Sequence, residues 1–552
     1  MVSKFVAILI FLCHILAVAC VGESRGPKLV VFLVVDQMRN DYLDRFTDLY
    51  EGGFRYLLDN GLRLTETYHE HAYTATAAGH LVLASGVFPG TAGIISNSWY
   101  VRKVKEMVYC VADENARPLS GSGPAVSYEN VNASALGDWI KSSYPRSKVF
   151  AVSSKDRSAI LLGGKNPDGV FWFDSNAGEF VSSDYYMEEY PEWFRELNRE
   201  KTIDNYVGKT WMRLLADESV YVERSREDEY PPEGSGEGEG DGSTFPHHYP
   251  VETGEEPVHY WALWGTPWLD ALTLELAETV ILKADLGKDE YPDLLGVALS
   301  AADGVGHRYG PFSQETMDMF LRLDKFLAEF FSFLDENVGL ENTLLVLSSD
   351  HGVAMLPEFA EQLGLDAGRI RTSMEVVIHK VEKTLEERWG AGEYIENSSS
   401  GCIYYNRNTM VNKGIAIPEV DSVVIPLLVK ESWINDVHSR AEIEGGGNLD
   451  HIGQLWRNQY HPDLSGDLFL TFGENYIWKD PPGTGHGTPH GYDTHVPLIL
   501  SGSAIESGTF HERLRTVDVA PTISHLLGIE YPGDIDGHPL DLSAFNKTVD
   551  SR

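Results

Sequence analysis

Acidic and histidine side chains occur in three short clusters of types and spacing that could bind metal ions. The clusters are Asp303 with His307, Asp350 with His351, and the glycine-rich loop 486–493, which holds His486 and His490. Carboxylate oxygens and imidazole nitrogens are ligands that zinc takes at about 2.0–2.2 Å. Two such ions about 4 Å apart can bind the attacking and leaving oxygens of an in-line phosphoryl transfer. The clusters therefore indicate metal-assisted chemistry on a phosphoryl group.

Thr76 is the candidate nucleophile. It opens the stretch Thr-Ala-Ala-Gly-His, where small side chains leave room for a substrate. The residues from Ala77 on favour a helix that ends at Gly86, which places Thr76 where free N–H groups and the helix dipole favour an anion. A bound metal would lower the pKa of its hydroxyl without a histidine base. A threonine here can also be only a helix cap, and Thr74 is the alternative nucleophile.

Three apolar runs are predicted as the strands that position the acids. They are 29–35, 293–300 and 343–347, and they lead to Asp36, Asp303 and Asp350. Short unbroken runs rich in Val and Leu are typical of strands buried on both faces of a parallel sheet. Because ligands of open α/β sheets bind beyond the carboxyl ends of the strands, we expect the three acids to meet there. Alternating strands and helices predict an α/β fold, with a mostly parallel central sheet sandwiched by helices and with inserted surface segments.

Two cations, Lys155 and Arg157, follow the predicted strand 149–153. In an extended chain, residues two apart share one face. Arginine can donate two parallel hydrogen bonds to phosphate, and lysine supplies a point charge. The chain has 83 acidic against 44 basic residues and a net charge of -39, so an inward-facing cation pair suits an anion, whereas two surface salt bridges are the alternative. The same net charge excludes nucleic acid and anionic membranes as expected partners.

Residues 1–25 are predicted as a signal peptide, because Lys4 precedes an apolar run and an Ala-Val-Ala cleavage site. Cleavage there would leave Cys20 first, so a lipid at Cys20 is the alternative to a free N-terminus. We therefore expect an exported protein, whether periplasmic, at the cell surface or secreted, with no transmembrane anchor after cleavage. Cys110 and Cys402 are the pair that remains for a disulfide in an oxidising compartment.

The remaining chain, 26–546, is predicted as one catalytic domain with insertions at about 170–290 and 355–465. Within the first insertion, the acidic and glycine-rich stretch 223–256 is expected to be partly disordered. Aromatic residues are dense over 171–194. We expect these rings to pack in a core, and stacking on an organic leaving group is the alternative.

A set of motifs resembles the alkaline phosphatase superfamily, most closely the secreted bacterial type with a threonine nucleophile. The motifs are Val-Val-Asp36-Gln-Met, Thr76-x-x-Gly-His, Ile-Ser-Asn97-Ser-Trp-Tyr, Ser-Ser-Lys155-Asp-Arg157, Asp303-x-x-Gly-His307, Ser-Asp350-His351-Gly and His486-Gly-Thr. The resemblance implies one zinc ion on Asp303, His307 and His486, and a second on Asp36, Asp350 and His351. It also implies that Thr76 bridges to the metals and forms a phosphothreonine, while Asn97, Lys155 and Arg157 bind the phosphoryl oxygens. His490 is the alternative to His486.

The activity implied by this resemblance is that of an exported alkaline phosphatase, which uses two Zn²⁺ ions to hydrolyse small-molecule phosphate monoesters. A monoester carries more charge on its non-bridging oxygens than a diester, so two cations at that position favour monoesters. A phosphodiesterase or nucleotide pyrophosphatase of the same superfamily is the alternative. An inactive relative that binds a phosphorylated ligand is the less favoured one. The family often has Gly-Pro after the nucleophile, where this chain has Ala77-Ala78.

Overall fold

The computed structural model describes residues 26–121, 123–234, 242–248, 260–502 and 505–542. The expected signal peptide with Cys20 lies outside the described residues, as does part of the acidic stretch 223–256. In the part of the chain that is described, every helix is too short or too polar to cross a bilayer.

A ten-stranded sheet forms the centre of the molecule, with strand order β18-β2-β19-β11-β1-β10-β5-β6-β7 and β20 paired to β2. Its middle consists of five parallel strands: β11 (Thr343–Ser348), β1 (Leu29–Val35), β10 (Asp293–Leu299), β5 (Val149–Ser153) and β6 (Gly169–Asp174). The other strands are β2 (Leu62–Tyr68), β7 (Glu179–Val181), β18 (His495–Val496), β19 (Leu498–Ser501) and β20 (Gly508–Arg515). The predicted α/β class with a mostly parallel central sheet is confirmed.

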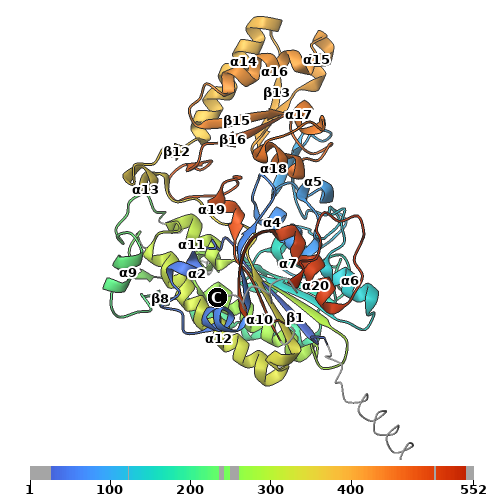
Figure 1. Ribbon diagram of the computed structural model, residues 1–552, viewed down its shortest axis with the longest axis vertical. Coiled ribbons are helices and arrows are strands. Elements are labelled where there is room, and N and C mark those ends of the chain that lie inside the picture. Colours follow the sequence, from blue (N-terminus) through green and yellow to red (C-terminus); the bar gives the residue numbers. More distant parts are fainter. Residues whose placement is uncertain (1–25, 122, 235–241, 249–259, 503–504, 543–552) are drawn as a thin grey trace, which may run out of the picture.

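Helices cover both faces of this sheet because successive side chains of each strand point to opposite sides. In β1, Val31 and Leu33 belong to one buried core, whereas Val30 and Phe32 belong to another. The first core includes α3 (Gly53–Asn60), α10 (Trp268–Lys283) and α12 (Gln314–Asn337), and the second includes α4 (Thr76–Ser85), α6 (Leu136–Ser143), α7 (Asp156–Gly163) and α20 (Val519–Leu527). The strands thus end between two helical layers (Figure 1).

The predicted insertion at about 170–290 is too wide, because β6, β7 and α10 are parts of the central sandwich. The rings of the aromatic segment pack there as expected: Phe171 and Phe194 are fully buried and stack with centroids 4.2 Å apart. The described start of the acidic stretch is also packed rather than disordered. Arg226 is buried, pairs with the buried Glu233 and lies 4.7 Å over the ring of Tyr230. A buried ion pair of this kind fixes the local chain.

Most of the chain between β11 and β18 forms a separate lobe, drawn in orange at the top of Figure 1. Its four-stranded antiparallel sheet has the order β13 (Ile395–Ser399), β14 (Cys402–Tyr405), β16 (Leu468–Phe472) and β15 (Ile434–Ser439), and α14 (Arg371–Trp389) and α16 (Ile417–Leu428) enclose its own core. We call 357–478 the inserted lobe. It extends past the expected bound of 465, because β16 pairs with β14 and β15 and not with the central sheet.

Cys110 and Cys402, the pair available for a disulfide, are both free thiols in the structure. Both side chains are buried, but they belong to different cores, one under the central sheet and one in the inserted lobe. Burial raises the pKa of each thiol to about 12, so both stay protonated and unreactive.

Candidate active site

The three acids lie close together as expected, but only two of them lie at the end of a strand. Asp36 directly follows β1, and Asp350 lies two residues beyond β11. Asp303 stands in the first turn of a helix, α11 (Ala301–Tyr309), and not at the end of a strand. Helical spacing of four residues then brings His307 to the same face, with Nε2 3.2 Å from Asp303 Oδ1.

The glycines of α11 serve close packing and do not make a turn. A Cβ on Gly304 would lie 1.7 Å from the carbonyl oxygen of Trp264, and one on Gly306 would lie 1.8 Å from Oε1 of Gln37. A glycine is therefore needed at 304, where the backbone of Trp264 lies close, in spite of its poor helix propensity, whereas a larger residue at 306 would have to displace the side chain of Gln37. From the sequence alone, the two glycines would have indicated a turn here and not a helix.

The acids and histidines form two adjoining clusters whose potential ligand atoms lie within 4.8 Å of one another. One consists of Asp36, Asp350 and His351, and the other of Asp303, His351 and His486. His351 Nε2 is 3.3 Å from Asp350 Oδ2, and His486 Nε2 is 3.9 Å from Asp303 Oδ1. With His307 included, the structure brings all six predicted acid and histidine ligands together.

Three histidines are oriented so that Nε2 faces the carboxylates. In each ring Nδ1 lies against a backbone carbonyl: that of Gly352 at 3.0 Å for His351, of Thr484 at 2.9 Å for His307, and of Thr74 at 2.7 Å for His486. Such a contact fixes the tautomer with the proton on Nδ1 and leaves Nε2 as a ligand. The alternative, His490, turns away instead and places Nε2 2.8 Å from the Phe472 carbonyl.

Unpaired buried atoms support a cation-binding role for these clusters. Among the described residues, Asp36 Oδ1, Asp350 Oδ2 and His351 Nε2 are buried and have no hydrogen-bond partner. Buried polar groups without partners are rare in folded proteins and call for an ion or water. Carboxylate oxygens and imidazole nitrogens in this arrangement fit divalent metal ions such as zinc.

The carboxylates perturb one another strongly. Burial, together with the charge of Asp350, raises the pKa of Asp36 well above its usual range. Burial acts in the same direction on Asp350, but His351, His80 and Lys155 together outweigh it and the pKa of Asp350 is lowered. At Asp303, His307 and a neighbouring lysine outweigh burial and hold the pKa well below its usual range. Acids this close compete for protons, and a divalent cation would relieve that competition.

Burial favours the neutral form of two of the imidazoles, those of His351 and His486, which is the form that metal binding requires. Burial lowers the pKa of His351, although the adjacent Asp350 opposes the shift. Burial lowers the pKa of His486 well below its usual range, and His351 adds to the effect. Neutral imidazoles next to carboxylates are ready to bind a metal without releasing a proton of their own.

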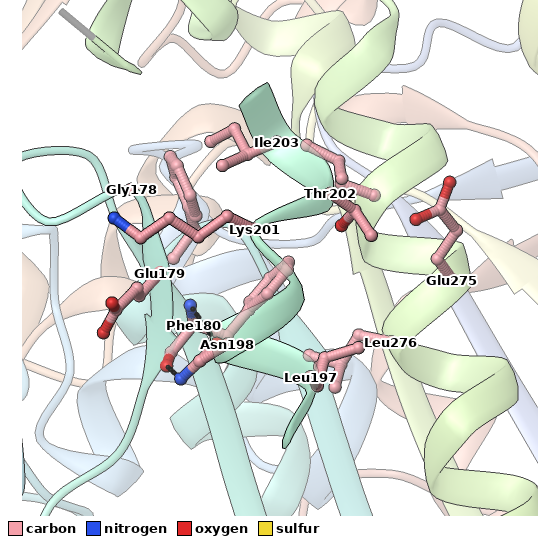
Figure 2. A pocket seen from close by; sticks show the side chains of 12 residues that line it. Gly178, Glu179, Phe180, Leu197, Asn198, Lys201, Thr202, Ile203, Glu275 and Leu276 are labelled. Atoms are coloured by element: carbon pink, nitrogen blue, oxygen red, sulfur yellow. Dashed lines mark hydrogen bonds between the residues drawn. The ribbon is translucent and has the colours of Figure 1, made fainter. Parts of the chain in front are cut away.

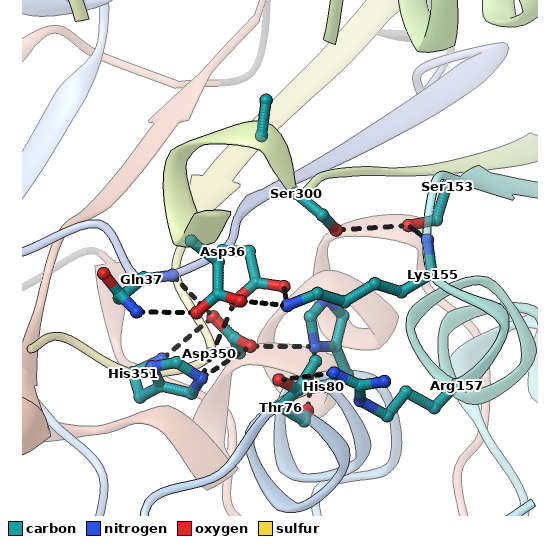
Figure 3. A network of polar contacts seen from close by, with 12 residues as sticks. Asp36, Gln37, Thr76, His80, Ser153, Lys155, Arg157, Ser300, Asp350 and His351 are labelled. Atoms are coloured by element: carbon teal, nitrogen blue, oxygen red, sulfur yellow. Dashed lines mark hydrogen bonds and ion pairs between the residues drawn. The ribbon is translucent and has the colours of Figure 1, made fainter. Parts of the chain in front are cut away.

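Thr76 is the first residue of α4, as predicted, and Gly86 ends this helix with a φ of 66°. Asn97 lies beside the helix N-terminus, where its Oδ1 accepts a hydrogen bond from the Ala77 N–H at 2.9 Å. Arg157 approaches from α7, with Nη2 3.5 Å from Thr76 Oγ1 (Figure 3). A hydroxyl, an amide and a guanidinium therefore converge at one helix N-terminus.

Lys155 and Arg157 do not share a face of an extended chain as expected, because α7 begins between them. The Lys155 side chain runs to the carboxylates, with Nζ 2.6 Å from both Asp36 Oδ2 and Asp303 Oδ2 (Figure 3). Arg157 turns instead toward Thr76 and Tyr109. The two cations therefore have different partners within the same site, one among the acids and one at the hydroxyl.

Sequence reasoning missed two residues of this network, Gln37 and His80. Gln37 has a φ of 66°, donates its backbone N–H to Asp350 Oδ1 at 3.1 Å, and donates Nε2–H to Asp303 Oδ1 at 2.6 Å. His80 Nδ1 lies 2.9 Å from the Thr76 carbonyl and 3.3 Å from Asp350 Oδ2. The spacing of four between Thr76 and His80 on a predicted helix was the available signal.

Gly79 lets helix α4 lie directly against the Asp350 backbone. A Cβ at Gly79 would be 2.0 Å from the Asp350 carbonyl oxygen and 2.6 Å from its carbon. We expect Gly79→Ala to push Thr76 and Asp350 apart and to lower kcat/KM by about a hundredfold, the usual cost of a displacement near 1 Å. We also expect a loss of about 2 kcal/mol in unfolding free energy.

The matched control is Gly533→Ala, where a Cβ would meet nothing within 4 Å. Phosphate ester hydrolysis and urea unfolding of both variants measure the two effects. Equal behaviour of the Gly79 and Gly533 variants would contradict the packing of α4 on Asp350.

The chain is similar in sequence and in fold to known proteins. The family model of type I phosphodiesterases and nucleotide pyrophosphatases matches residues 30–398. The alkaline phosphatase PafA of Elizabethkingia meningoseptica is 34% identical over 525 residues, which cover 93% of this chain and 94% of the relative. A protein of Myroides odoratus named calcium-transporting ATPase is 31% identical over 552 residues, with 95% and 96% covered.

The alkaline phosphatase PhoV of Synechococcus elongatus is 32% identical over 528 residues, which cover 92% of this chain and 91% of the relative. The crystal structure of wild-type PafA superimposes with a TM-score of 0.86 at 33% identity and covers 93% of this chain and 98% of that structure. The resemblance inferred from the motifs is confirmed. The chain belongs to the type I phosphodiesterase and nucleotide pyrophosphatase family, within the alkaline phosphatase superfamily.

Proposed function

We propose that this protein is an exported, zinc-dependent alkaline phosphatase that hydrolyses small-molecule phosphate monoesters through a phosphothreonine at Thr76. The observation that carries the proposal is the juxtaposition of the Thr76 hydroxyl, the Arg157 guanidinium and two acid and histidine clusters within one site. Relatives of similar length that are named alkaline phosphatases support it.

Two zinc ions are the metals that fit best in this proposal. Asp303, His307 and His486 would hold one ion, and Asp36, Asp350 and His351 the other, since their free Nε2 and carboxylate oxygens face inward. When bound, the ions supply Lewis acidity and lower the pKa of the threonine hydroxyl.

The chain's own residues orient the reaction. The Thr76 oxygen attacks phosphorus and loses its proton, the bond from phosphorus to the ester oxygen breaks, and the alcohol leaves with that electron pair and gains a proton. Water then attacks phosphorus and loses a proton, the bond from phosphorus to the Thr76 oxygen breaks, the threonine regains a proton and phosphate leaves. Arg157 and the Asn97 amide donate hydrogen bonds to the non-bridging oxygens, where charge must be stabilised throughout.

The rival activity is that of a phosphodiesterase, which the description of the family model names. The buried cations favour the monoesterase. Arg157 reaches the nucleophile and places a positive charge beside the phosphoryl group, while Lys155, 6% exposed, adds a second positive charge among the acids of the same site. A monoester dianion gains more from them than a diester monoanion does.

The experiment is a side-by-side assay of 4-nitrophenyl phosphate and bis(4-nitrophenyl) phosphate, with zinc and then with a chelator. We expect strong preference for the monoester, loss of turnover with chelator and recovery on adding zinc. Preference for the diester in the parent protein would establish the phosphodiesterase instead. Absence of turnover for both esters with zinc present would establish the non-catalytic, ligand-binding alternative.

A further inference from the structure

The function proposed above does not use a hollow that lies beside the site. It has a volume of about 150 Å³ and lies between the catalytic loop at His486 and the inserted lobe. Its walls include Tyr73, Phe472 and Trp478. We propose that this hollow binds the flat aromatic leaving group of a phosphate monoester, an inference that rests on the proposed phosphatase function and narrows its substrate class.

Three walls of the hollow are joined directly to predicted catalytic or metal-binding residues. Tyr73 lies three residues before Thr76, and its ring atoms would lie 3.2 Å from a Cβ placed on Gly487, next to His486. His486 itself lines the hollow. A phosphoryl group at Thr76 therefore has an enclosed space beside it for the group that it carries.

The third wall approaches Asn97. Ser400, from the turn between β13 and β14, donates its hydroxyl toward Ser96 Oγ at 3.1 Å and the Ser98 carbonyl at 3.2 Å. These two residues flank Asn97, which we assign to the phosphoryl oxygens. The inserted lobe is thus tied to the site at the point where a substrate would enter.

The aromatic rings are arranged to offer a face to a ligand. Trp478 remains 39% exposed, which is unusual for a large ring, and it stacks on the buried Phe472 with centroids 5.8 Å apart and planes at 25°. Phe472 is held in turn by Trp433, at 6.2 Å. A ring fixed from behind and open in front can stack on a planar group at little entropic cost.

The dimensions and the edge of the hollow suit one aromatic ring. An apolar cavity of this volume is large enough to hold benzene. Leu470 and Met374 supply apolar wall, while three serines at 398–400 and Thr488 place hydroxyls at its edge. The hydroxyls of Ser400 and Thr488 already donate hydrogen bonds within the protein, but their oxygens can accept one from a polar substituent on the ring, so a phenolic leaving group fits this chemistry.

Two other hollows lack this combination. One lies under the loop at Lys201, with Glu275 and Ile203 in its wall (Figure 2), and its free volume of about 20 Å³ holds little more than a water molecule. The other measures about 750 Å³, but its arginines are already paired, Arg39 with Asp41 and Arg63 with Asp44. Neither includes a residue of the proposed catalytic set.

The test is equilibrium binding of phenylphosphonate and methylphosphonate to the zinc-loaded protein by calorimetry. The two compounds share the charged head group and differ in the ring. We expect the phenyl compound to bind about tenfold more tightly, and Trp478→Ala to remove most of this advantage while leaving the affinity for methylphosphonate unchanged. Trp478→Phe keeps a ring and should retain the preference.

The matched control is Trp389→Ala, which removes a partly buried indole of the same lobe outside the hollow. An equal affinity of the parent protein for both phosphonates, or a preference that survives Trp478→Ala, would overturn the inference. The underlying function is tested separately by hydrolysis of phenyl phosphate. Binding of the phenyl compound without hydrolysis would refute the phosphatase and leave the aromatic subsite standing.

Discussion

Replacement of Thr76 by alanine is expected to lower kcat/KM for a phosphate monoester by about 10⁴-fold, because the nucleophile is removed while its surroundings remain. Thr76 is 1% exposed and makes its side-chain contact with Arg157. Alanine at the first position of α4 suits a helix and leaves no large cavity, so the fold should persist. The loss of activity would therefore come from the missing nucleophile and not from unfolding. Circular dichroism and the zinc content of the variant check that the fold and the metal site are intact.

Two further measurements separate a nucleophile from a helix cap. Thr76→Ser keeps a hydroxyl at the same place and should retain activity within about a hundredfold, whereas a residue that only caps the helix would affect stability in Thr76→Ala and leave turnover by the folded protein similar in both variants. Acid quenching during turnover of a radiolabelled ester should trap phosphate on the parent protein and on the serine variant only. Trapped label in Thr76→Ala would place the phosphoryl group elsewhere, with Thr74 as the first candidate.

The central part of the fold followed directly from the sequence. Continuous apolar runs such as 29–35 can only be buried on both faces, which required a parallel sheet between helices, and the acids at the strand ends then had to meet. Thr76 was predictable for a similar local reason, since small residues and Gly86 define its helix. These conclusions depended on patterns that the chain carries within a few residues.

Structural features that depend on contacts with residues far away in the sequence could not be predicted from local patterns. Gly304 and Gly306 suggest a turn, but they are glycines because Trp264 and Gln37 press against that helix. Strand β16 has the composition of a central strand, yet its partners belong to the inserted lobe. Nothing local in either stretch reveals which neighbour it will meet.

The direction of the Lys155 side chain was also missed, and it changes what the cation pair does. A spacing of two predicted a joint phosphate grip, whereas the helix that starts at Asp156 separates the two side chains. Lys155 contacts Asp36 and Asp303, so it neutralises acids of the proposed metal clusters, while Arg157 alone approaches the nucleophile. Variants of the two residues should therefore fail in different ways.

The double variant Lys155→Ala/Arg157→Ala is expected to lose about 10⁴-fold in kcat/KM for a monoester and no more than about tenfold for the matching diester. Arg157 as a donor to developing charge and Lys155 as a second positive charge in the site are each expected to contribute about 10²-fold, and the monoester dianion depends on positive charge more. Parallel assays of the two 4-nitrophenyl esters measure the ratio. The surface variant Lys141→Ala, which breaks an ion pair with Asp168 away from the site, is the control.

The single variants then distinguish the two roles. Arg157→Ala should lower the monoesterase rate while the unfolding free energy changes little, since the guanidinium contacts Thr76 and Tyr109 rather than the carboxylate clusters. Lys155→Ala leaves Asp36 and Asp303 without their buried partner, so in the presence of chelator it should cost about 3 kcal/mol of stability, and zinc should restore part of this. Equal losses of stability in both variants would contradict the division of roles. If diesterase activity falls by the same factor as monoesterase activity, neither cation discriminates between the two esters by the charge of the phosphoryl group.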